Sequence, residues 1–382
     1  MEIKIDQLDS YMNGLFNQRD FSTLEKVAHQ VTKQRPEIAT AWRYLGIVNI
    51  LTRKNGKTHL QQATLHGDVD AELWLEVLSE FEYYPKGTVH PIHISRQVYF
   101  ARMRRSKYMD FPKEVNIETQ AICNAACSFC VYPTMERKGD KMSDELIDKI
   151  IDDLKAIPQD LPFIISPFKV SDPFLDKRIF LICEKINNEL PNAKLRLFTN
   201  GSPLTEKIVD KIADIKNVVH LWISLNEYEK NAYEATMKLP FEKTIEKLNA
   251  LHTRVENGYP HSVAVSRVCD NSLEDVKFKQ FLATYYPLFG CSLIGRSDWA
   301  GQLDIGSQKQ VSPTACVRWY ELSIMASGKV ALCCMDGEGK HVVGDVNKNS
   351  VLEIYNSRDY RKMREYSFSR LAVAAPCDVC IY

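Results

Sequence analysis

The sequence predicts an α/β protein built around a partial (β/α)6, TIM-like barrel, and three observations lead to this fold class. Six short apolar runs alternate with amphipathic helical patterns between residues 113 and 305. Residues 1–85 have helical periodicity with almost no strand signal, and residues 306–382 combine a β-hairpin with a helix. Repeated strand–helix alternation implies parallel strands joined by right-handed crossovers. We therefore expect a helical domain, a barrel domain and a small C-terminal hairpin and helix domain.

The periodicity also places the individual elements. The expected barrel strands are Glu114–Glu118, Phe163–Val170, Lys194–Thr199, Val218–Leu225, Ser262–Cys269 and Cys291–Gly295. The expected barrel helices are Asp144–Ala156, Lys177–Leu190, Glu206–Ile215, Phe241–Glu256 and Leu273–Tyr286. In the C-terminal domain, we expect a hairpin of Leu322–Met325 with Lys329–Cys333, followed by a helix at Ser350–Tyr366. A doubly wound open sheet fits the same pattern, although no G-x-G-x-x-G sequence follows the first strand.

Trp42, Leu45 and Gly46 form a W-x-x-L-G pattern after Pro36, as in tetratricopeptide repeats. One or two degenerate repeats rarely stand alone, so we expect residues 1–85 to pack on the next domain. A plain helical bundle that caps the barrel is the alternative to a partner-binding groove. Residues 86–112, which prolines punctuate, are expected to form a linker.

Composition narrows the class of protein. The chain carries 49 basic and 49 acidic side chains, so its charge balance favours neither nucleic acid nor an anionic membrane as a partner. No apolar run is long enough to span a bilayer, and the N-terminus lacks the layout of a signal peptide. We expect a cytoplasmic protein. Thiols stay reduced there, so its 11 cysteines indicate metal binding or chemistry rather than disulfides.

Cys123, Cys127 and Cys130 form a C-x3-C-x2-C group directly after the first expected strand. Three thiolates on one loop suit a cubane iron–sulfur cluster and leave its fourth iron without a protein ligand, open to a substrate or cofactor. A tetrahedral zinc site is the alternative, but it needs a fourth ligand, and the nearest histidines, His93 and His220, are distant in sequence.

A second cysteine group lies in the last seventy residues. Four or five thiols on a hairpin and a terminal C-x-x-C can converge on one metal, and structural zinc is again an alternative. Strand alternation places the adjacent pair Cys333 and Cys334 on opposite faces. The group consists of Cys316, Cys333, Cys334, Cys377 and Cys380, whereas Cys183, Cys269 and Cys291 stand alone and are expected to be small buried hydrophobes.

The first group, with Phe129 before its last cysteine, matches the C-x3-C-x-aromatic-C motif of the radical S-adenosylmethionine (SAM) superfamily. The resemblance covers residues 113–298. It implies a [4Fe–4S] cluster whose open iron binds SAM, and an external electron donor such as flavodoxin or ferredoxin. Cleavage of SAM would give a 5′-deoxyadenosyl radical that abstracts hydrogen from an unactivated C–H bond.

The resemblance also implies SAM contacts at Phe129 and beyond the cysteine motif. Val170-Ser171-Asp172-Pro173 stands where the family usually carries Gly-Gly-Glu-Pro, so Ser171 and Asp172 are expected near the SAM amino group, although both glycines are missing. Asn200 ends the third strand as in many relatives. For Asp172 and Asn200, turn chemistry is the alternative explanation.

Two further contacts follow from the fourth and fifth strands. Ser224 and Asn226 end the fourth strand, where relatives commonly contact the ribose, and turn chemistry is again the alternative. Arg267, on the fifth strand, is expected to face the SAM carboxylate, or else to form an interior salt bridge.

The second cysteine group resembles the SPASM/twitch extension of the same superfamily through its C…G-x4-C…C-x2-C layout. The cysteine count fits the twitch form, with one auxiliary [4Fe–4S] cluster. Its expected ligands are Cys316, Cys377, Cys380 and one of the adjacent pair, where the G-x4-C spacing from Gly328 favours Cys333 over Cys334.

An auxiliary cluster can take the electron that a substrate radical loses, so we expect a two-electron oxidation of a small polar or sugar-like substrate. The alternative enzyme is a peptide maturase that epimerises or crosslinks residues. A non-catalytic iron–sulfur or zinc scaffold is the alternative from another class. No side chain stands out by its spacing as the general base.

Overall fold

Two units make up the chain in this computed structural model, which describes residues 5–82, 89–305, 311–366 and 368–381. Residues 1–106 and 313–315 belong to the first unit, and residues 107–312 and 316–382 to the second. The boundary expected at 85/86 lies outside the described residues, and the one expected at 305/306 falls where the described range 89–305 ends. The barrel and the C-terminal segment, which the sequence predicts as two domains, share the second unit.

The first unit is a series of helices in which each packs against the next one along the chain. The helices are α1 (Ile5–Asn17), α2 (Phe21–Gln34), α3 (Ala39–Leu51), α4 (Lys57–Leu65), α5 (Val69–Phe81) and α6 (Pro91–Arg104). Gly46 lies where a Cβ would come within 2.8 Å of the Leu60 side chain, so α3 and α4 approach closely. The Trp42 indole donates a hydrogen bond to the Pro36 carbonyl at 2.7 Å. The relation to tetratricopeptide repeats stays a prediction.

Helix α6 is a correction to the expected linker. Its residues belong to the first unit, and Val98, Phe100 and Met103 are buried. Pro91 occupies the first turn, where its missing N–H costs no hydrogen bond, and the His90 side chain accepts from the N–H of Ile92. The proline that indicated a linker in the sequence is therefore a helix start.

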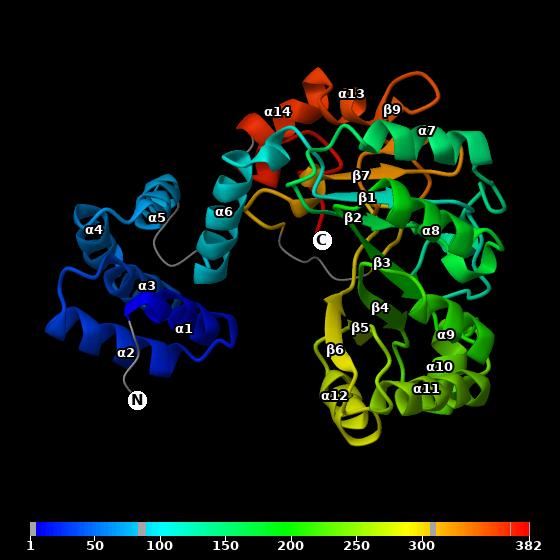
Figure 1. Ribbon diagram of the computed structural model, residues 1–382, viewed down its shortest axis with the longest axis horizontal. Coiled ribbons are helices and arrows are strands. Elements are labelled where there is room, and N and C mark those ends of the chain that lie inside the picture. The colour runs from blue at the N-terminus through cyan, green and yellow to red at the C-terminus, as the bar shows by residue number, and fades with distance from the viewer. Residues whose placement is uncertain (1–4, 83–88, 306–310, 367, 382) are drawn as a thin grey trace. The chain divides into compact units, whose positions relative to one another are not determined.

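A nine-stranded sheet organises the second unit, in the order β6-β5-β4-β3-β2-β1-β7-β8-β9 (Figure 1). Strands β1 to β6 are parallel, and neighbours in sequence are neighbours in the sheet. A doubly wound sheet would reverse its order at a switch point, so the uninterrupted order confirms the partial barrel. These strands are β1 (Glu114–Ile117), β2 (Phe163–Ser166), β3 (Ala193–Thr199), β4 (Val218–Ser224), β5 (Val263–Cys269) and β6 (Gly290–Gly295).

Alternation along the strands gives the barrel sheet two different faces. Leu197 and Leu221 belong to the main core together with helix residues such as Ile150 and Ile186. Their sequence neighbours take the opposite face, since successive side chains alternate. The helices of this region are α7 (Asp144–Leu154), α8 (Ile179–Glu189), α9 (Glu206–Ala213), α10 (Lys230–Met237), α11 (Phe241–Glu256) and α12 (Leu273–Tyr285), of which α10 was not expected.

The C-terminal segment extends the same sheet. β7 (Glu321–Ile324) pairs in parallel with β1, then turns back antiparallel into β8 (Lys329–Ala331) and β9 (Val342–Asp345). The hairpin was expected, but neither its pairing with β1 nor β9 was. The expected helix at Ser350–Tyr366 is divided into α13 (Val351–Tyr355) and α14 (Arg358–Tyr366). The loop after β8, which carries Cys333 and Cys334, therefore begins in the same sheet as the barrel strands.

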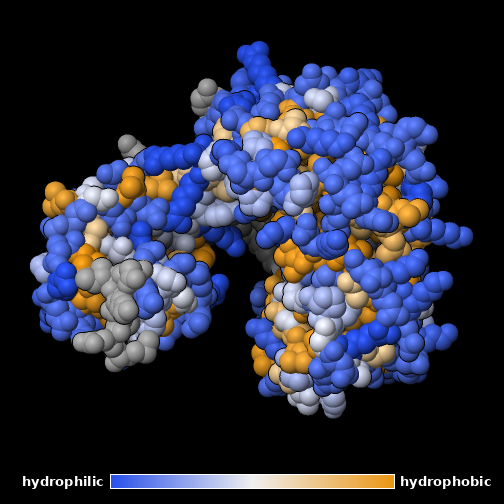
Figure 2. Space-filling view, in the orientation of Figure 1, coloured by the Kyte–Doolittle hydropathy of each residue, from blue (hydrophilic) through white to orange (hydrophobic). Residues whose placement is uncertain are grey.

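The surface adds two observations. Figure 2 shows hydrophobic atoms among polar ones at the end of the second unit formed by α12, where Leu273, Val276 and Tyr285 are exposed. Among the described residues, none of the helices combines the length and the apolar character that crossing a bilayer requires.

Candidate metal centres

The first cysteine group lies on the loop that follows β1, at the carboxyl end of that strand. All three thiols are half-buried. Cys123 and Cys127 pack against the main core, whereas Cys130 packs against a smaller cluster that includes Val131 and Met135. The loop therefore places its three cysteines at the carboxyl end of β1, where chemistry was expected.

Helix α10 anchors this loop. The N–H groups of Ala126 and Ser128 donate to the carbonyls of Met237 and Thr236 at 3.2 and 3.0 Å. The Met237 Sδ lies 3.5 Å from the Cys127 Sγ. Sequence reasoning missed this anchor, because backbone carbonyls at a helix end leave no residue-type signal.

The surroundings of the sulfur atoms fit an iron–sulfur cluster. Burial raises the pKa of Cys123 to about 12 and that of Cys130 to about 11, and it raises the pKa of Cys127 as well, so iron must displace these protons. The N–H groups of Ala125 and Tyr132 donate to the Sγ atoms of Cys123 and Cys130 at 3.5 and 3.4 Å. Such donors stabilise thiolates and tune cluster potentials.

Among the described residues, no three His, Cys, Asp or Glu side chains converge on one metal ion. A cubane does not require such convergence, because each of its irons takes its own thiolate.

Asp172 joins the ends of two strands to the cysteine loop. Its carboxylate accepts hydrogen bonds from the Thr199 hydroxyl and the Asn200 N–H, both at 2.9 Å, and from the Phe174 N–H at 3.2 Å. Its own N–H donates to the Ile122 carbonyl at 2.8 Å. Burial raises the pKa of Asp172 to about 6. The carboxylate is thus held beside the loop, with turn-forming contacts that the sequence also suggested.

Asn200 lies directly beside the cysteine group. Its Nδ2 donates to the Asn124 Oδ1 at 2.8 Å and lies 3.8 Å from the Cys123 Sγ. Ser171 precedes Asp172 and is buried, and Phe129 packs its ring against the main core. The structure therefore gathers these four expected SAM-contact residues around one loop.

The residues from strands β4 and β5 form a second arm of the site. The Asn226 Nδ2 donates to the Ser224 hydroxyl at 2.8 Å and lies 3.3 Å from the Met237 Sδ, the atom that contacts Cys127. The Arg267 guanidinium donates to the Asn226 carbonyl at 2.6 Å and forms ion pairs with Glu227 and Asp275. Of its two expected roles, the interior salt bridge is the one this geometry displays.

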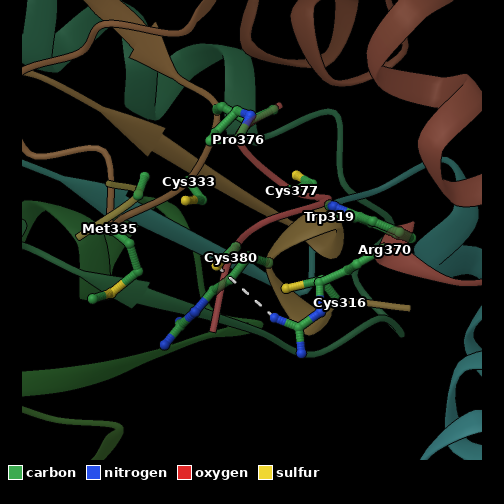
Figure 3. Close-up of a pocket in the computed structure, with 11 residues that line it drawn as sticks. Cys316, Trp319, Cys333, Met335, Arg370, Pro376, Cys377 and Cys380 are labelled. Atoms are coloured by element: carbon green, nitrogen blue, oxygen red, sulfur yellow. Dashed lines mark hydrogen bonds between the residues drawn. The ribbon is translucent and has the colours of Figure 1, made fainter. Parts of the chain in front are cut away.

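The second cysteine group lines one cavity with about 390 Å³ of atom-free space, part of it open to solvent. Figure 3 shows Cys316, Cys333, Cys377 and Cys380 among the residues that line this cavity. The Arg370 guanidinium is buried and lies 3.9 Å from the Cys380 Sγ. Four thiols around one cavity fit a second cluster, and Arg370 supplies a neighbouring positive charge that sequence reasoning missed.

Cys334 does not line this cavity. Burial raises the pKa of its thiol, and the charges of Arg318, Glu321, Lys169 and Glu114 also act on it. Cys333, by contrast, lies within electrostatic reach of Cys316. The adjacent cysteines thus have different surroundings. Both lie beyond the end of β8 at Ala331, so the strand alternation that the sequence suggested does not apply to them.

The isolated cysteines differ from one another. Cys183 is buried in the core of α8, as expected, and Cys269 is half-buried. The prediction for Cys291 is wrong, because this residue is exposed on β6, the strand at the edge of the sheet.

Two family models match the segments that carry the two cysteine groups. The family model of the radical SAM superfamily matches residues 117–275, and that of the SPASM iron–sulfur cluster-binding domain matches residues 316–381. The former implies a [4Fe–4S] cluster with SAM, and the latter an auxiliary iron–sulfur cluster. The comparison with curated proteins finds no match.

Three solved structures illustrate the structural similarity. SuiB of Streptococcus suis bound to the precursor peptide SuiA has a TM-score of 0.55 at 12% identity, over 90% of this chain and 86% of that one. anSMEcpe with bound AdoMet has a TM-score of 0.51 at 13% identity, over 69% and 84%. BtrN in complex with AdoMet and 2-DOIA has 0.49 at 15% identity, over 71% and 94%. The SuiB and anSMEcpe similarities, at identities this low, establish the fold and not the reaction.

Proposed function

Because the chain contains a radical SAM domain followed by a SPASM domain, we propose that it binds SAM at a [4Fe–4S] cluster held by Cys123, Cys127 and Cys130. The single observation that carries this proposal is the three-thiol loop at the carboxyl end of β1, with Asn200 beside Cys123. When bound, the cluster and SAM supply a 5′-deoxyadenosyl radical that abstracts hydrogen.

The protein's own residues would orient SAM around that loop. Asp172 is the carboxylate for the SAM ammonium, and Asn200 provides an amide beside the cluster. Ser224 and Asn226 would contact the ribose, and Asn226 is linked to Cys127 through Met237. Ser171 and Phe129 complete the wall, and Arg267 acts through its hydrogen bond to the Asn226 carbonyl rather than by touching SAM.

We assign the auxiliary cluster to Cys316, Cys333, Cys377 and Cys380, the four thiols that line one cavity. A second cluster gives the protein an electron acceptor, so the reaction that fits best is a two-electron oxidation of a small polar or sugar-like substrate. An external reductant such as flavodoxin or ferredoxin would supply the first electron.

The inner face of the barrel sheet supports a small ring-shaped substrate. Phe168 stacks on Phe198 with ring centroids 4.6 Å apart, and Phe198 lies 5.8 Å from Trp222. His220 lies beside Trp222, and its buried Nε2 has no hydrogen-bond partner among the described residues. Half-buried rings with a few polar groups are typical of small-molecule sites.

The test of SAM cleavage is direct. Anaerobically reconstituted protein, given SAM and dithionite, should release 5′-deoxyadenosine. Replacing Cys123, Cys127 and Cys130 together with alanine should abolish this release. The control variant Cys269→Ala with Cys291→Ala removes two thiols outside both groups and should retain it. If the triple variant still cleaves SAM, the assignment of this loop is wrong.

A peptide maturase is the second candidate, supported by the SuiB structure with its precursor peptide, whose match extends over 90% of this chain. A maturase should change the mass of a short precursor peptide encoded beside it, by epimerisation with deuterium uptake or by crosslinking. An enzyme that dehydrogenates a small molecule should leave that peptide unchanged. If its substrate carries deuterium at the carbinol carbon, the deuterium should appear in 5′-deoxyadenosine.

A further inference from the structure

The segment between the last barrel strand and the second cysteine group touches both cysteine sites. The Trp299 indole Nε1 donates to the Phe129 carbonyl at 2.8 Å, within the Cys127–Cys130 stretch. The Trp299 side chain also packs against the small cluster that contains Val131. The next residue, Ala300, lines the cavity of the four cysteines. Two consecutive residues therefore reach from one site to the other.

The backbone of this segment is strained at the point of contact. Trp299 and Ala300 have φ of 53° and 56°, and Gly301 follows with 80°. A left-handed conformation is unfavourable for a residue with a Cβ, and bulky residues rarely adopt it. Strain of this kind persists only where surrounding contacts hold it. Here the Phe129 hydrogen bond holds Trp299 from one side.

A second set of contacts ties the segment to the loop that carries Cys333. The Gln302 Nε2 donates to the Asp336 Oδ1 at 3.2 Å, and the Gln302 Oε1 accepts from the Glu338 N–H at 3.2 Å. Asp336 is fully buried and also accepts from the N–H groups of Lys340 and His341. Residues 297–303 therefore contact both the loop that carries Cys130 and the loop that carries Cys333.

We propose that residues 297–303, which we call the bridge segment, couple the two cluster sites, with Trp299 as the positioning residue. The proposal rests on the proposed function in that both cysteine groups hold clusters. A cluster that orders one loop then stabilises the other loop through the bridge segment, so each cluster is retained more tightly when its counterpart is present. Coupling of this kind is reciprocal.

The test uses the full-length chain, reconstituted anaerobically with iron and sulfide. Trp299→Phe keeps an aromatic ring and removes the indole donor. It is made in the wild-type chain and in the Cys377→Ala, Cys380→Ala chain, which lacks the second site. A ferrous chelator then removes iron from the three-cysteine site. The rate of this loss is measured by EPR of the reduced protein, from the part of the signal that changes when SAM is added. Trp42→Phe is the matched control, because Trp42 also donates to a backbone carbonyl, at 2.7 Å in the first unit.

In the two-cluster chain, Trp299→Phe should speed iron loss from the three-cysteine site about fivefold, which corresponds to about 1 kcal/mol. In the chain without the second site, loss should already be faster, and Trp299→Phe should add less than about twofold. Trp42→Phe should change neither rate. Equal acceleration in both chains would overturn the proposal, because Trp299 would then support only its own loop, and so would no acceleration in either.

Two further results distinguish failure of the proposed function from failure of the coupling. If the wild-type chain takes up no cluster at Cys123, Cys127 and Cys130, the proposed function is wrong. If Trp299→Phe does not fold, as judged by circular dichroism, Gln302→Leu cuts the other end of the bridge segment and should give the same pattern of rates. A folded Gln302→Leu chain with unchanged rates would then overturn the coupling.

Discussion

The Glu118 carboxylate and the Arg137 guanidinium form a two-contact ion pair within the connection from β1 to α7 that carries the three cysteines. Glu118 also accepts hydrogen bonds from the N–H groups of Val170 and Ala326, at 3.2 and 3.3 Å. Arg137 donates twice to the Gly337 carbonyl, at 2.8 and 2.6 Å. These contacts join the end of β1, the loop after β2, the β7–β8 turn and the loop after Cys334 in one polar network. The Glu118 side chain at its centre is fully buried.

Breaking this pair should therefore destabilise the second unit. Glu118→Gln leaves the Arg137 charge without its buried partner, and removal of one member of such a pair costs about 3–5 kcal/mol. We expect a clearly lower unfolding midpoint in urea and loss of iron from the three-cysteine site. Asp152→Asn, which removes a partner of the exposed Lys155 pair on α7, should leave the midpoint unchanged. A Glu118→Gln midpoint equal to that of the wild type would show that the network is dispensable.

The adjacent cysteines offer a matched pair of variants. Cys333 lines the cavity with the three other thiols and Cys334 does not, so Cys333→Ala should cost the protein the irons of one cubane. Cys334→Ala should leave the iron content and the EPR signal of both clusters intact. Iron analysis together with EPR of the reduced protein distinguishes the two. The reverse result would move the ligand to Cys334.

Much of this architecture can be predicted from local sequence signals. Alternating apolar runs indicate the strands, and the C-x3-C-x2-C spacing marks the loop after β1. The position of β7 cannot be predicted in this way. Asn116 pairs in register with Ser323, and no local pattern specifies a partner so distant in the sequence.

The candidate site likewise contains residues that the sequence predicts and residues that only the three-dimensional structure reveals. Cysteines and the Asp172 stretch are recognisable by residue type and spacing. Met237 holds the loop through its backbone carbonyl and its sulfur, and Trp299 contributes a strained backbone and one indole hydrogen bond. These roles depend on three-dimensional contacts between remote segments, which hydrophobic periodicity does not encode.

Asp172 gives the site an expected pH dependence. Burial raises its pKa to about 6 in the folded chain, against about 3.9 in an unfolded one. Between these values the folded state binds more protons, so this group's contribution to stability is lost as pH rises through the window. The ionised form that can hold the SAM ammonium exists above about pH 6, so SAM affinity should fall as pH is lowered below that value.

The measurement is the dissociation constant of SAM, by anaerobic equilibrium dialysis, from about pH 5 to about pH 8. Asp172→Asn should weaken SAM binding and flatten the profile. Asp176→Asn is the control. Burial alone would raise the pKa of Asp176, but its hydrogen bonds with Arg178 and other contacts lower it overall, so that carboxylate stays ionised throughout this range. An unchanged profile in Asp172→Asn would show that another group controls SAM binding.

Gly337 and Val131 touch so closely that each limits the size of the other. A Cβ on Gly337 would lie 2.4 Å from the Val131 Cγ2, one residue after Cys130. Gly337→Ala should therefore push the cysteine loop and destabilise the unit by about 1–3 kcal/mol, the usual cost of overpacking. Adding Val131→Ala removes the clashing methyl group, so the double variant should recover most of the lost stability and iron.

Gly295→Ala is the matched control, because nothing lies within 4 Å of the Cβ it would add at the end of β6. Its unfolding midpoint and iron content should equal those of the wild type. The informative quantity is the interaction energy between the Gly337 and Val131 substitutions, obtained from a double-mutant cycle. Purely additive effects would mean that the loop shifts to avoid the contact, and that the packing of the segment after Cys334 does not position the three-cysteine loop.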